Sequence, residues 1–504
     1  MKLVLNGHDE RYTVEQGMLN LFPGEKPVYG PIGPEDQSWA IVSLREDDSC
    51  HVTVELCWQG KAVPYSLGVP LEGDAFQREG IRRRAIGRCF FLAARQVTGA
   101  APPWGMLTGV RPVKLPTRAL AGGASLEQAR RQLEEDFHVS PARAGLAVQC
   151  AQASLAAQRS LNPNEVSLYL GIPFCPTRCA YCSFVSAGVG RTLQLVEPYA
   201  DRLLEEIDGL AQVLERAGRT IRSFYMGGGT PTTLTAGQLD RILARCRAAL
   251  PLDSCTEYTV EAGRPDTITR EKLEVLKSRG VDRISINPQT LEDHVLAAIG
   301  RKHSAGDIAA ANALARSVGF RCINMDLIAG LPQDSFQGFR RSLEGVLEMA
   351  PENITVHTLA LKKGSTLISQ GGPLPSGEEV QRMLDYSREI LTQQGYIPYY
   401  LYRQKYMSGS LENVGWAKPG TESLYNIVMM EELHTVLSLG AGGVTKLIDP
   451  AAGRIVRLVN PKFPQEYLSA GDKQAGQREE IAAFFLSPAE TPSASSTLFS
   501  GGKM

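Results

Sequence analysis

The stretch 167–184, SLYLGIPFCPTRCAYCSF, places three cysteines in a short loop directly after an apolar segment. The segment Ser167–Pro173 contains few polar residues and predicts a buried strand. Cys175, Cys179 and Cys182 follow it with C-x3-C-x2-C spacing. The stretch therefore predicts a strand whose carboxyl end carries a loop rich in thiols.

The same order of strand, loop and amphipathic helix recurs in the chain that follows. Segments between the strands repeat apolar residues with the period of an α-helix. Parallel neighbours in a sheet need such crossover helices. Six units in succession predict an α/β fold with a partial (β/α)6 TIM-like barrel, and an open doubly wound sheet is the alternative. The further strands are predicted at Ser223–Met226, Glu257–Glu261, Arg283–Asn287, Ile323–Ile328 and Thr355–Leu361.

Unusual residues gather where each predicted strand ends. Enzymes with α/β barrels build their active sites on this carboxyl face of the strands. The pattern therefore predicts one shared site. After the cysteine loop, its members are GGGTP at 227–231, Glu261, Gln289, Asp326–Pro332 and His357–Gly364.

Composition excludes few classes of protein but favours a globular one. The chain has 504 residues, of which 43% are hydrophobic and 21% charged, and its formal net charge is −1. This balance gives no support to a nucleic-acid binder, which usually carries a basic excess. No apolar run approaches the roughly 18 residues of a membrane span, and the amino terminus lacks an apolar signal core. We expect a cytoplasmic protein without a membrane span.

Three thiolates in one loop favour an iron–sulfur cluster over zinc. A closed zinc site usually has four ligands, and this loop holds neither a fourth cysteine nor a histidine. A [4Fe–4S] cluster that is bound by three cysteines leaves one iron open to the amine and carboxylate of an amino acid. The other seven cysteines are scattered, and we expect small buried residues there.

Two motifs together resemble a known superfamily. LYLGIPFCPTRCAYCSF and GGGTPT resemble the radical S-adenosylmethionine (SAM) enzymes, and more narrowly their oxygen-independent coproporphyrinogen III oxidase-like branch. The stretches 103–120, PWGMLTGVRPVKLPTRAL, and 400–417, YLYRQKYMSGSLENVGWA, resemble the HemZ-type subgroup of coproporphyrinogen dehydrogenases. The resemblance covers nearly the whole chain except its carboxyl-terminal tail.

The resemblance implies a role for each matching position. Cys175, Cys179 and Cys182 would bind the [4Fe–4S] cluster and serve catalysis. Tyr181 would stack near the adenine of S-adenosylmethionine, and Tyr169 would contact its methionine carboxylate. Glycines let bare backbone approach a ligand, and we expect exposed amides at the GGGTP turn to bind it. The further cofactor contacts implied are Gly228, Gly229, Thr230, Glu261, Gln289, Arg301 and Asp326.

The resemblance also implies a reaction. The reduced cluster would cleave S-adenosylmethionine to a 5′-deoxyadenosyl radical, with a flavodoxin or ferredoxin as electron donor. The substrate would be a tetrapyrrole, coproporphyrinogen III, whose two propionates become vinyl groups of protoporphyrinogen IX in haem biosynthesis. The cations expected to face its carboxylates are Arg264, Lys302, Lys362, Lys363, Arg403 and Lys405.

One departure from the pattern keeps alternatives open. The best-characterised oxidases carry a further cysteine two residues after the motif, whereas this chain has Ser183 and Phe184 there. The C-S-F ending is similar to that of the haem-chaperone branch. A haem chaperone, or a radical enzyme that acts on another tetrapyrrole such as a haem-degrading methyltransferase, are therefore the alternatives.

The expected organisation has four parts. Residues 1–160 are predicted to form an α+β domain, because strands are expected at Trp39–Leu44 and His51–Cys57, one helix at Phe76–Val97 and two helices within Ser125–Ala157. Residues 161–365 are the barrel core, and 366–486 a mixed carboxyl-terminal region similar to that of HemN. Residues 487–504 are small and polar and predict a disordered tail.

Overall fold

A computed structural model of the chain describes residues 1–22, 24–182, 187–362, 365–367, 373–404, 407–450 and 452–486. The predicted tail at 487–504 and the proposed cations Lys363 and Lys405 lie outside these ranges. The described residues divide into two compact units. One comprises Met1–Val148 with Gly409–Leu411, and the other the described parts of Gln149–Ser408 and Glu412–Met504.

Six parallel strands form the centre of the second unit, and they lie side by side in sequence order. Each pairs in parallel with the next, as the crossover pattern predicted. The α/β fold class is thus confirmed. The strands are β6 (Glu165–Ile172), β9 (Thr220–Gly228), β10 (Glu257–Gly263), β11 (Arg283–Ile286), β12 (Cys322–Ala329) and β13 (Asn353–Thr358).

Strands from the carboxyl-terminal region extend this sheet at both sides. β15 (Asn413–Ala417) pairs antiparallel with β13, and β14 (Ile397–Tyr402) with β15. On the other side β16 (Val436–Leu439) pairs in parallel with β6, followed by β17 (Val444–Asp449) and β18 (Arg454–Val459). Among the described strands β14 and β18 are the two edges, so the barrel is partial and open.

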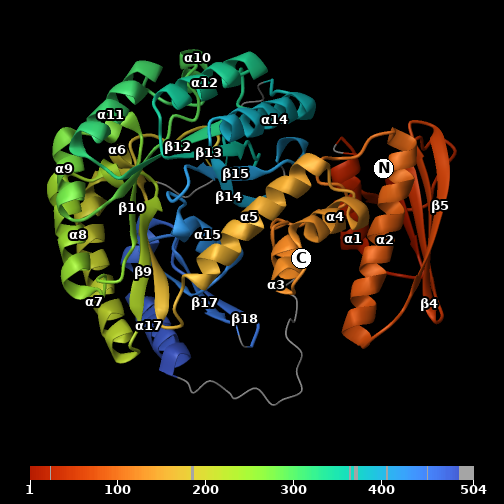
Figure 1. Cartoon of the computed structure of the whole chain (residues 1–504), viewed down its shortest axis with the longest axis horizontal. Helices are drawn as coiled ribbons and strands as arrows, with labels where there is room; N and C mark the ends of the chain where they lie inside the picture. Colours follow the sequence, from red (N-terminus) through yellow and green to blue (C-terminus); the bar gives the residue numbers. More distant parts are fainter. Residues whose placement is uncertain are drawn as a thin grey trace. The chain divides into compact units, whose positions relative to one another are not determined.

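Amphipathic helices cover the outer side of the curved sheet, as Figure 1 shows for α7, α8, α9, α11, α12 and α14. In α7 the apolar residues that recur with helical spacing, such as Leu203, Ile207 and Leu210, are buried. Burial of this apolar face holds the helix against the sheet. The helices are α7 (Val196–Arg216), α8 (Ala236–Ala249), α9 (Arg270–Ser278), α10 (Asp293–Ala298), α11 (Ala305–Val318), α12 (Phe336–Glu348), α14 (Gly377–Gln393), α15 (Leu424–Glu431), α16 (Pro464–Leu468) and α17 (Gly471–Leu486).

The first unit is a five-stranded sheet packed on helices, with the strand order β2-β1-β3-β4-β5. In its hydrophobic core, alternate residues of the strands, such as Val42 and Val54, pack with Phe90 of the helix α2 (Ala75–Thr98). The five expected elements are present as β3, β4, α2, α4 and α5, whereas β1, β2, β5, α1 and α3 were not anticipated. The elements are β1 (Lys2–Asn6), β2 (Val28–Tyr29), β3 (Trp39–Glu46), β4 (Ser49–Trp58), β5 (Lys61–Pro70), α1 (Arg11–Leu21), α2 (Ala75–Thr98), α3 (Lys114–Ala121), α4 (Leu126–Asp136) and α5 (Pro141–Arg159), which continues into the second unit.

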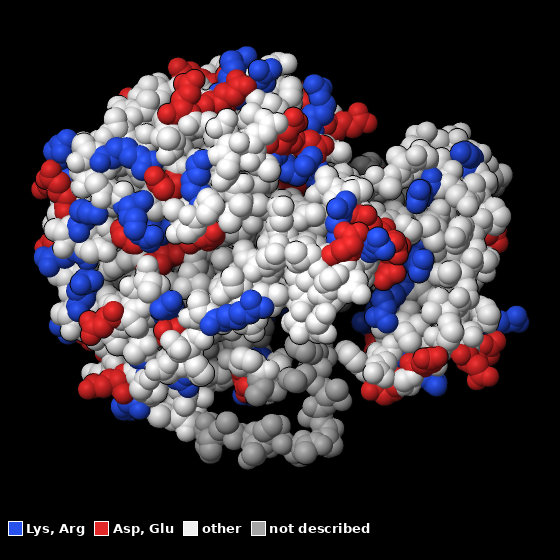
Figure 2. Space-filling view, in the orientation of Figure 1, with Lys and Arg blue, Asp and Glu red and all other residues white. Residues whose placement is uncertain are grey.

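Charges of both signs are mixed over the face of the molecule drawn in Figure 2. Many belong to ion pairs such as Arg245 with Asp208 and Arg279 with Asp240. Such exposed pairs contribute little to stability. Within the described part of the chain, no helix has both the length and the apolar character needed to cross a bilayer.

A buried carboxylate holds the carboxyl-terminal elements against α7. Glu206 of α7 accepts hydrogen bonds from the Gly440 amide (2.7 Å), the Tyr467 hydroxyl (2.6 Å) and the Asn460 amide (3.2 Å). Burial raises the pKa of Glu206, while these three donors oppose the shift. The Glu206 carboxylate therefore accepts hydrogen bonds from the turn after β16, from the segment after β18 and from α16.

We expect Glu206→Ala to lower the free energy of unfolding by about 2–5 kcal/mol, because it leaves three buried donors without an acceptor. Urea denaturation followed by circular dichroism measures this change. Glu205→Ala is the matched control, because the neighbouring Glu205 side chain is 66% exposed, and its effect should stay within about 0.5 kcal/mol. Equal effects of the two variants would contradict the role of Glu206.

Candidate functional site

The cysteine loop begins where β6 ends. Its first residues form the short strand β7 (Phe174–Cys175), which pairs in parallel with β8 (Ala187–Gly188). The loop then turns back through a hydrogen bond from the Cys182 amide to the Cys179 carbonyl (3.1 Å), while the Ala180 amide donates to Ile299 (3.0 Å). All three loop cysteines are partly buried. The loop is thus attached to the segment after α10.

Each loop thiol has a different polar neighbour. The Cys175 Sγ lies 3.5 Å from the Thr230 Oγ1, Cys179 lies beside the Arg301 guanidinium, and Cys182 lies near Lys362. Burial lowers the pKa of Lys362, and the Cys182 thiolate opposes this shift. In the part of the chain that the structure describes, no three Cys, His, Asp or Glu side chains are grouped closely enough to hold a metal ion.

The donor set nevertheless fits an iron–sulfur cluster. Three partly buried thiols on one short loop are the ligand type that such a cluster requires. Nearby cations stabilise the thiolate form, which is the form that binds iron. Metal binding and the ordering of a site are coupled, so a cluster would draw the three sulfurs together.

Arg301 fastens the second half of the loop. Its side chain is buried and donates hydrogen bonds to the Tyr181 hydroxyl (3.1 Å) and to the Asn287 carbonyl (2.6 Å) after β11. The Tyr181 ring packs against the apolar cluster that contains Leu296 and Ile299. Arg301 and Tyr181, both chosen from the sequence, therefore lie together, while stacking of Tyr181 on an adenine stays a prediction.

The GGGTP turn differs from the expectation of exposed amides. The Gly229 amide donates to the Ile172 carbonyl (2.7 Å), and the Thr230 amide donates to the Phe174 carbonyl (2.8 Å). The Gly228 amide donates to Glu261. These three amides are therefore engaged within the protein, because the turn packs directly on the end of β6.

Tyr169 and Glu261 lie together on the inner side of the sheet. A Cβ added to Gly228 would lie 3.1 Å from the Tyr169 hydroxyl, which places this ring beside the glycine turn. Glu261 accepts a hydrogen bond of 2.6 Å from the Tyr225 hydroxyl. Tyr225 stacks on Tyr425, with ring centroids 4.5 Å apart, and Tyr169 stacks on both. Burial raises the pKa of Glu261 to about 7.

Asp326 lies on β12, and Gln289 lies in the segment that follows β11. Burial opposes ionisation of Asp326, but His357 and the Asn324 amide, which donates at 2.8 Å, outweigh it and lower the pKa. The His357 Nε2 lies 3.8 Å from the Asp326 carboxylate, and the Tyr402 hydroxyl lies 3.5 Å from its Nδ1. Gln289 has a left-handed backbone conformation (φ 69°), and its backbone N–H donates a hydrogen bond to the backbone carbonyl of Asp326 (2.8 Å).

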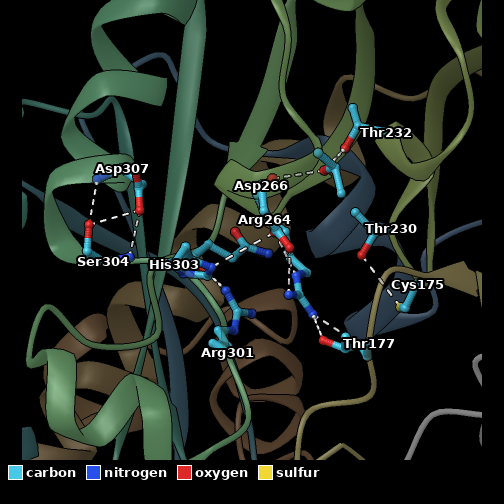
Figure 3. Close-up of polar contacts among 12 residues, drawn as sticks. Cys175, Thr177, Thr230, Thr232, Arg264, Asp266, Arg301, His303, Ser304 and Asp307 are labelled. Carbon is cyan, nitrogen blue, oxygen red and sulfur yellow. Dashed lines mark hydrogen bonds and ion pairs between the residues drawn. The ribbon is translucent and has the colours of Figure 1, made fainter.

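The structure corrects the role expected for Arg264 and reveals residues that sequence reasoning missed. Arg264 is buried, and its guanidinium binds Asp266 and Thr177 (Figure 3), so it does not present a free cation to a substrate. Tyr225 and Tyr425 were also missed. Tyr225 stands two residues before GGGTP on a predicted strand, which is the one signal in the sequence for an inward-facing aromatic residue.

Comparison with known proteins adds a family and a fold. The radical SAM superfamily model matches residues 169–344. The oxygen-independent coproporphyrinogen-III oxidase-like protein HemZ of Bacillus subtilis is 37% identical over 93% of this chain and 95% of its own length. The haem chaperone HemW of Escherichia coli is 28% identical over 60% of this chain and 75% of its own. The crystal structure of coproporphyrinogen III oxidase (HemN) from E. coli, 23% identical, covers 66% of this chain and 78% of its own with a TM-score of 0.51, which shows a similar fold.

We expect Cys179→Ala to abolish the visible absorbance that iron and sulfide produce on anaerobic reconstitution, because a cluster would lose one of three thiolate ligands. Cys255→Ala is the matched control, since this partly buried cysteine lies outside the loop and donates to the Glu257 carbonyl. Iron per chain and the absorbance spectrum measure the outcome. Retained iron and colour in Cys179→Ala would refute the ligand assignment.

Glu261 should make stability depend on pH in the protein without cofactors. Its pKa rises from 4.5 to about 7 on folding, so both states are protonated below pH 4.5. Above that pH only the unfolded state loses the proton, and stability falls as pH rises through about 7. Glu261→Gln lacks this ionisation. Between pH 4.5 and pH 8 the free energy of unfolding of wild type should therefore fall by about 2–3 kcal/mol relative to that of the variant. Urea denaturation at both pH values tests this, and parallel pH profiles would contradict it.

Proposed function

Because the chain belongs to the radical SAM superfamily, within the oxygen-independent coproporphyrinogen III oxidase-like branch, we propose that it converts coproporphyrinogen III to protoporphyrinogen IX in haem biosynthesis. The cofactors of this family are a [4Fe–4S] cluster and S-adenosylmethionine. When bound, they supply a 5′-deoxyadenosyl radical that removes a hydrogen atom from the substrate. Each of two propionates loses one hydrogen atom to such a radical and then releases carbon dioxide, while one electron passes to an acceptor, which leaves a vinyl group.

The share of the chain that matches each relative supports coproporphyrinogen III as the substrate. The relation to the oxidase-like HemZ spans 93% of this chain, so it includes the first unit and the carboxyl-terminal strands. The relation to the E. coli haem chaperone spans 60%. A protein that shares both flanking regions with an oxidase-like relative is better explained as acting on the same class of substrate than as a chaperone.

The residues of this chain would divide the work between two places. The three loop cysteines would hold the cluster, with Arg301 and Lys362 near the sulfurs. Tyr169, Glu261 and Asp326, together with Gly228, Gly229, Thr230 and Gln289, would hold S-adenosylmethionine along the inner side of the sheet. The stacked tyrosines would keep water from the reacting carbon, because radical chemistry needs a site without competing hydrogen donors.

A substrate with four carboxylates needs nearby positive charge or hydrogen-bond donors. Of the six cations expected from the sequence, Lys302, Lys362 and Arg403 remain as candidates among the described residues. Arg403 is buried, and burial lowers its pKa to about 10. His357 adds a donor at the end of β13, where 26% of its side chain is exposed beside Asp326. We propose these groups as contacts to the propionates.

Two further proposals concern the surroundings of the enzyme. A flavodoxin or ferredoxin would deliver electrons to the cluster. Reduced clusters and thiolate ligands survive best in a reducing compartment, which supports a cytoplasmic location.

The proposed reaction is tested by anaerobic incubation of the reconstituted protein with coproporphyrinogen III, S-adenosylmethionine and a strong reductant. We expect protoporphyrinogen IX and 5′-deoxyadenosine to form together, and Cys179→Ala to form neither. Chromatography with mass detection measures both products. Stable haem binding without turnover would favour the haem chaperone, and methylated or ring-opened tetrapyrrole would favour the haem-degrading methyltransferase. Either result would overturn the proposal.

A further inference from the structure

Arg264 joins the end of β10 to the cysteine loop (Figure 3). Its Nη1 donates to the Thr177 Oγ1 (2.8 Å) and carbonyl (3.1 Å). Its Nε and Nη2 donate to the two carboxylate oxygens of Asp266, at 2.9 and 2.8 Å. Thr177 lies midway between Cys175 and Cys179, so the guanidinium binds the centre of the first half of the loop.

A bulge in β10 aims this side chain. The register between β10 and β11 shifts between Glu261 and Gly263, and Gly263 has the positive φ of 42° that favours glycine. As a result Glu261 faces Tyr225 and the glycine turn, whereas Arg264 reaches the cysteine loop. The bulge in β10 therefore sets the direction of both the Glu261 and the Arg264 side chains.

The position of Asp266 is set by the turn that follows. Pro265, Asp266 and Thr267 form one 3-10 turn. The Thr267 hydroxyl donates to the Arg264 carbonyl (2.8 Å) and lies 2.7 Å from the hydroxyl of Thr232. Thr232 in turn donates to the Ala262 carbonyl (3.0 Å). The Arg264 and Asp266 pair is thus built on a hydrogen-bonded frame rather than on a free loop.

The buried side chain of His303 lies between Arg301 and the pair formed by Arg264 and Asp266 (Figure 3). Its side chain is 1% exposed and lies 3.9 Å from Asp266, close to Arg301 (Figure 3). Burial first, and then the charges of Arg301 and Arg264, lower its pKa to about 4, so it is neutral at neutral pH. Asp266 therefore balances the charge of Arg264 without competition from an imidazolium.

The two halves of the loop are fastened in the same way. Arg301 binds Tyr181 between Cys179 and Cys182, and Arg264 binds Thr177 between Cys175 and Cys179. The loop residues 176–179 have no helix or strand hydrogen bonds of their own in the structure. We propose that Arg264, held by Asp266, is a positioning residue that orders the first half of the cysteine loop for cluster binding. The proposal concerns the loop and holds whichever tetrapyrrole is the substrate.

An arginine suits this task better than a lysine. Its planar fork of five N–H donors can bind a carboxylate with two of them and a second group with the others. A lysine keeps the charge but cannot hold Asp266 by two parallel hydrogen bonds and reach Thr177 at the same time. The proposal therefore predicts that Arg264→Lys fails to restore what Arg264→Leu removes.

The test follows the loop in the full-length protein before any cluster is added. Hydrogen–deuterium exchange of peptides that span 174–182 should be at least about tenfold faster in Arg264→Leu than in wild type, because charge-assisted hydrogen bonds to the loop are lost. Iron per chain after anaerobic reconstitution should fall at least about threefold. Arg264→Lys should resemble Arg264→Leu in both measurements.

The matched control is Arg279→Leu. Arg279 also binds an aspartate, Asp240, through Nε and Nη2, at 2.6 and 2.8 Å, but on the outer helices. This variant should leave exchange of the loop and iron content unchanged. If Arg264→Leu fails to fold, Thr177→Ala tests the same contact, because it removes only the side-chain acceptor and should accelerate exchange to a smaller degree. Loop exchange and iron content equal to those of the control, or full rescue by lysine, would overturn the proposal.

Discussion

The ends of the first two parallel strands meet so closely that only glycine fits between them. A Cβ on Gly229 would lie 2.5 Å from the Phe174 carbonyl oxygen, a separation that real Cβ atoms essentially never show. The contact is held by the hydrogen bonds from the Gly229 amide to Ile172 at the end of β6 and from the Thr230 amide to Phe174 in β7. It sets the point from which the cysteine loop leaves the sheet, and it brings the Thr230 hydroxyl to the Cys175 sulfur. A hydrogen bond to such a sulfur is one of the means by which proteins tune a cluster.

Around this contact the charges of the site separate by sign. Carboxylates lie on the inner side of the sheet, at Glu261 and Asp326, and the cations beside the loop sulfurs are Arg301 and Lys362. A cluster with three thiolate ligands carries negative charge, whereas S-adenosylmethionine carries a sulfonium and an ammonium group. The arrangement supports the two cofactor positions proposed for the chain, because each group would meet charge of the opposite sign.

The central fold could be predicted because its signals are local. Apolar strands and amphipathic helices alternate with clear periods, and all six parallel strands were located within a few residues. The additions at the two sides of the sheet could not be predicted, since the partners of β15 and β16 lie far away in the sequence. The same distinction between local signals and contacts of distant segments applies to the site. The cysteines were evident from spacing, but the task of Arg264 depends on a bulge and on Thr177, a loop residue without a distinguishing pattern, so its charge alone suggested a substrate contact.

The parallel pairing of β6 with β16 governs when the site can be completed. Tyr169 lies opposite Ser438, so the strand that leads into the cysteine loop has β9 on one side and a late segment of the chain on the other. During synthesis on the ribosome, Cys175, Cys179 and Cys182 emerge long before Val436–Leu439 does. One edge of this strand can find its partner only after Val436–Leu439 has been made, so the complete sheet beneath the cysteine loop forms late in the synthesis of the chain.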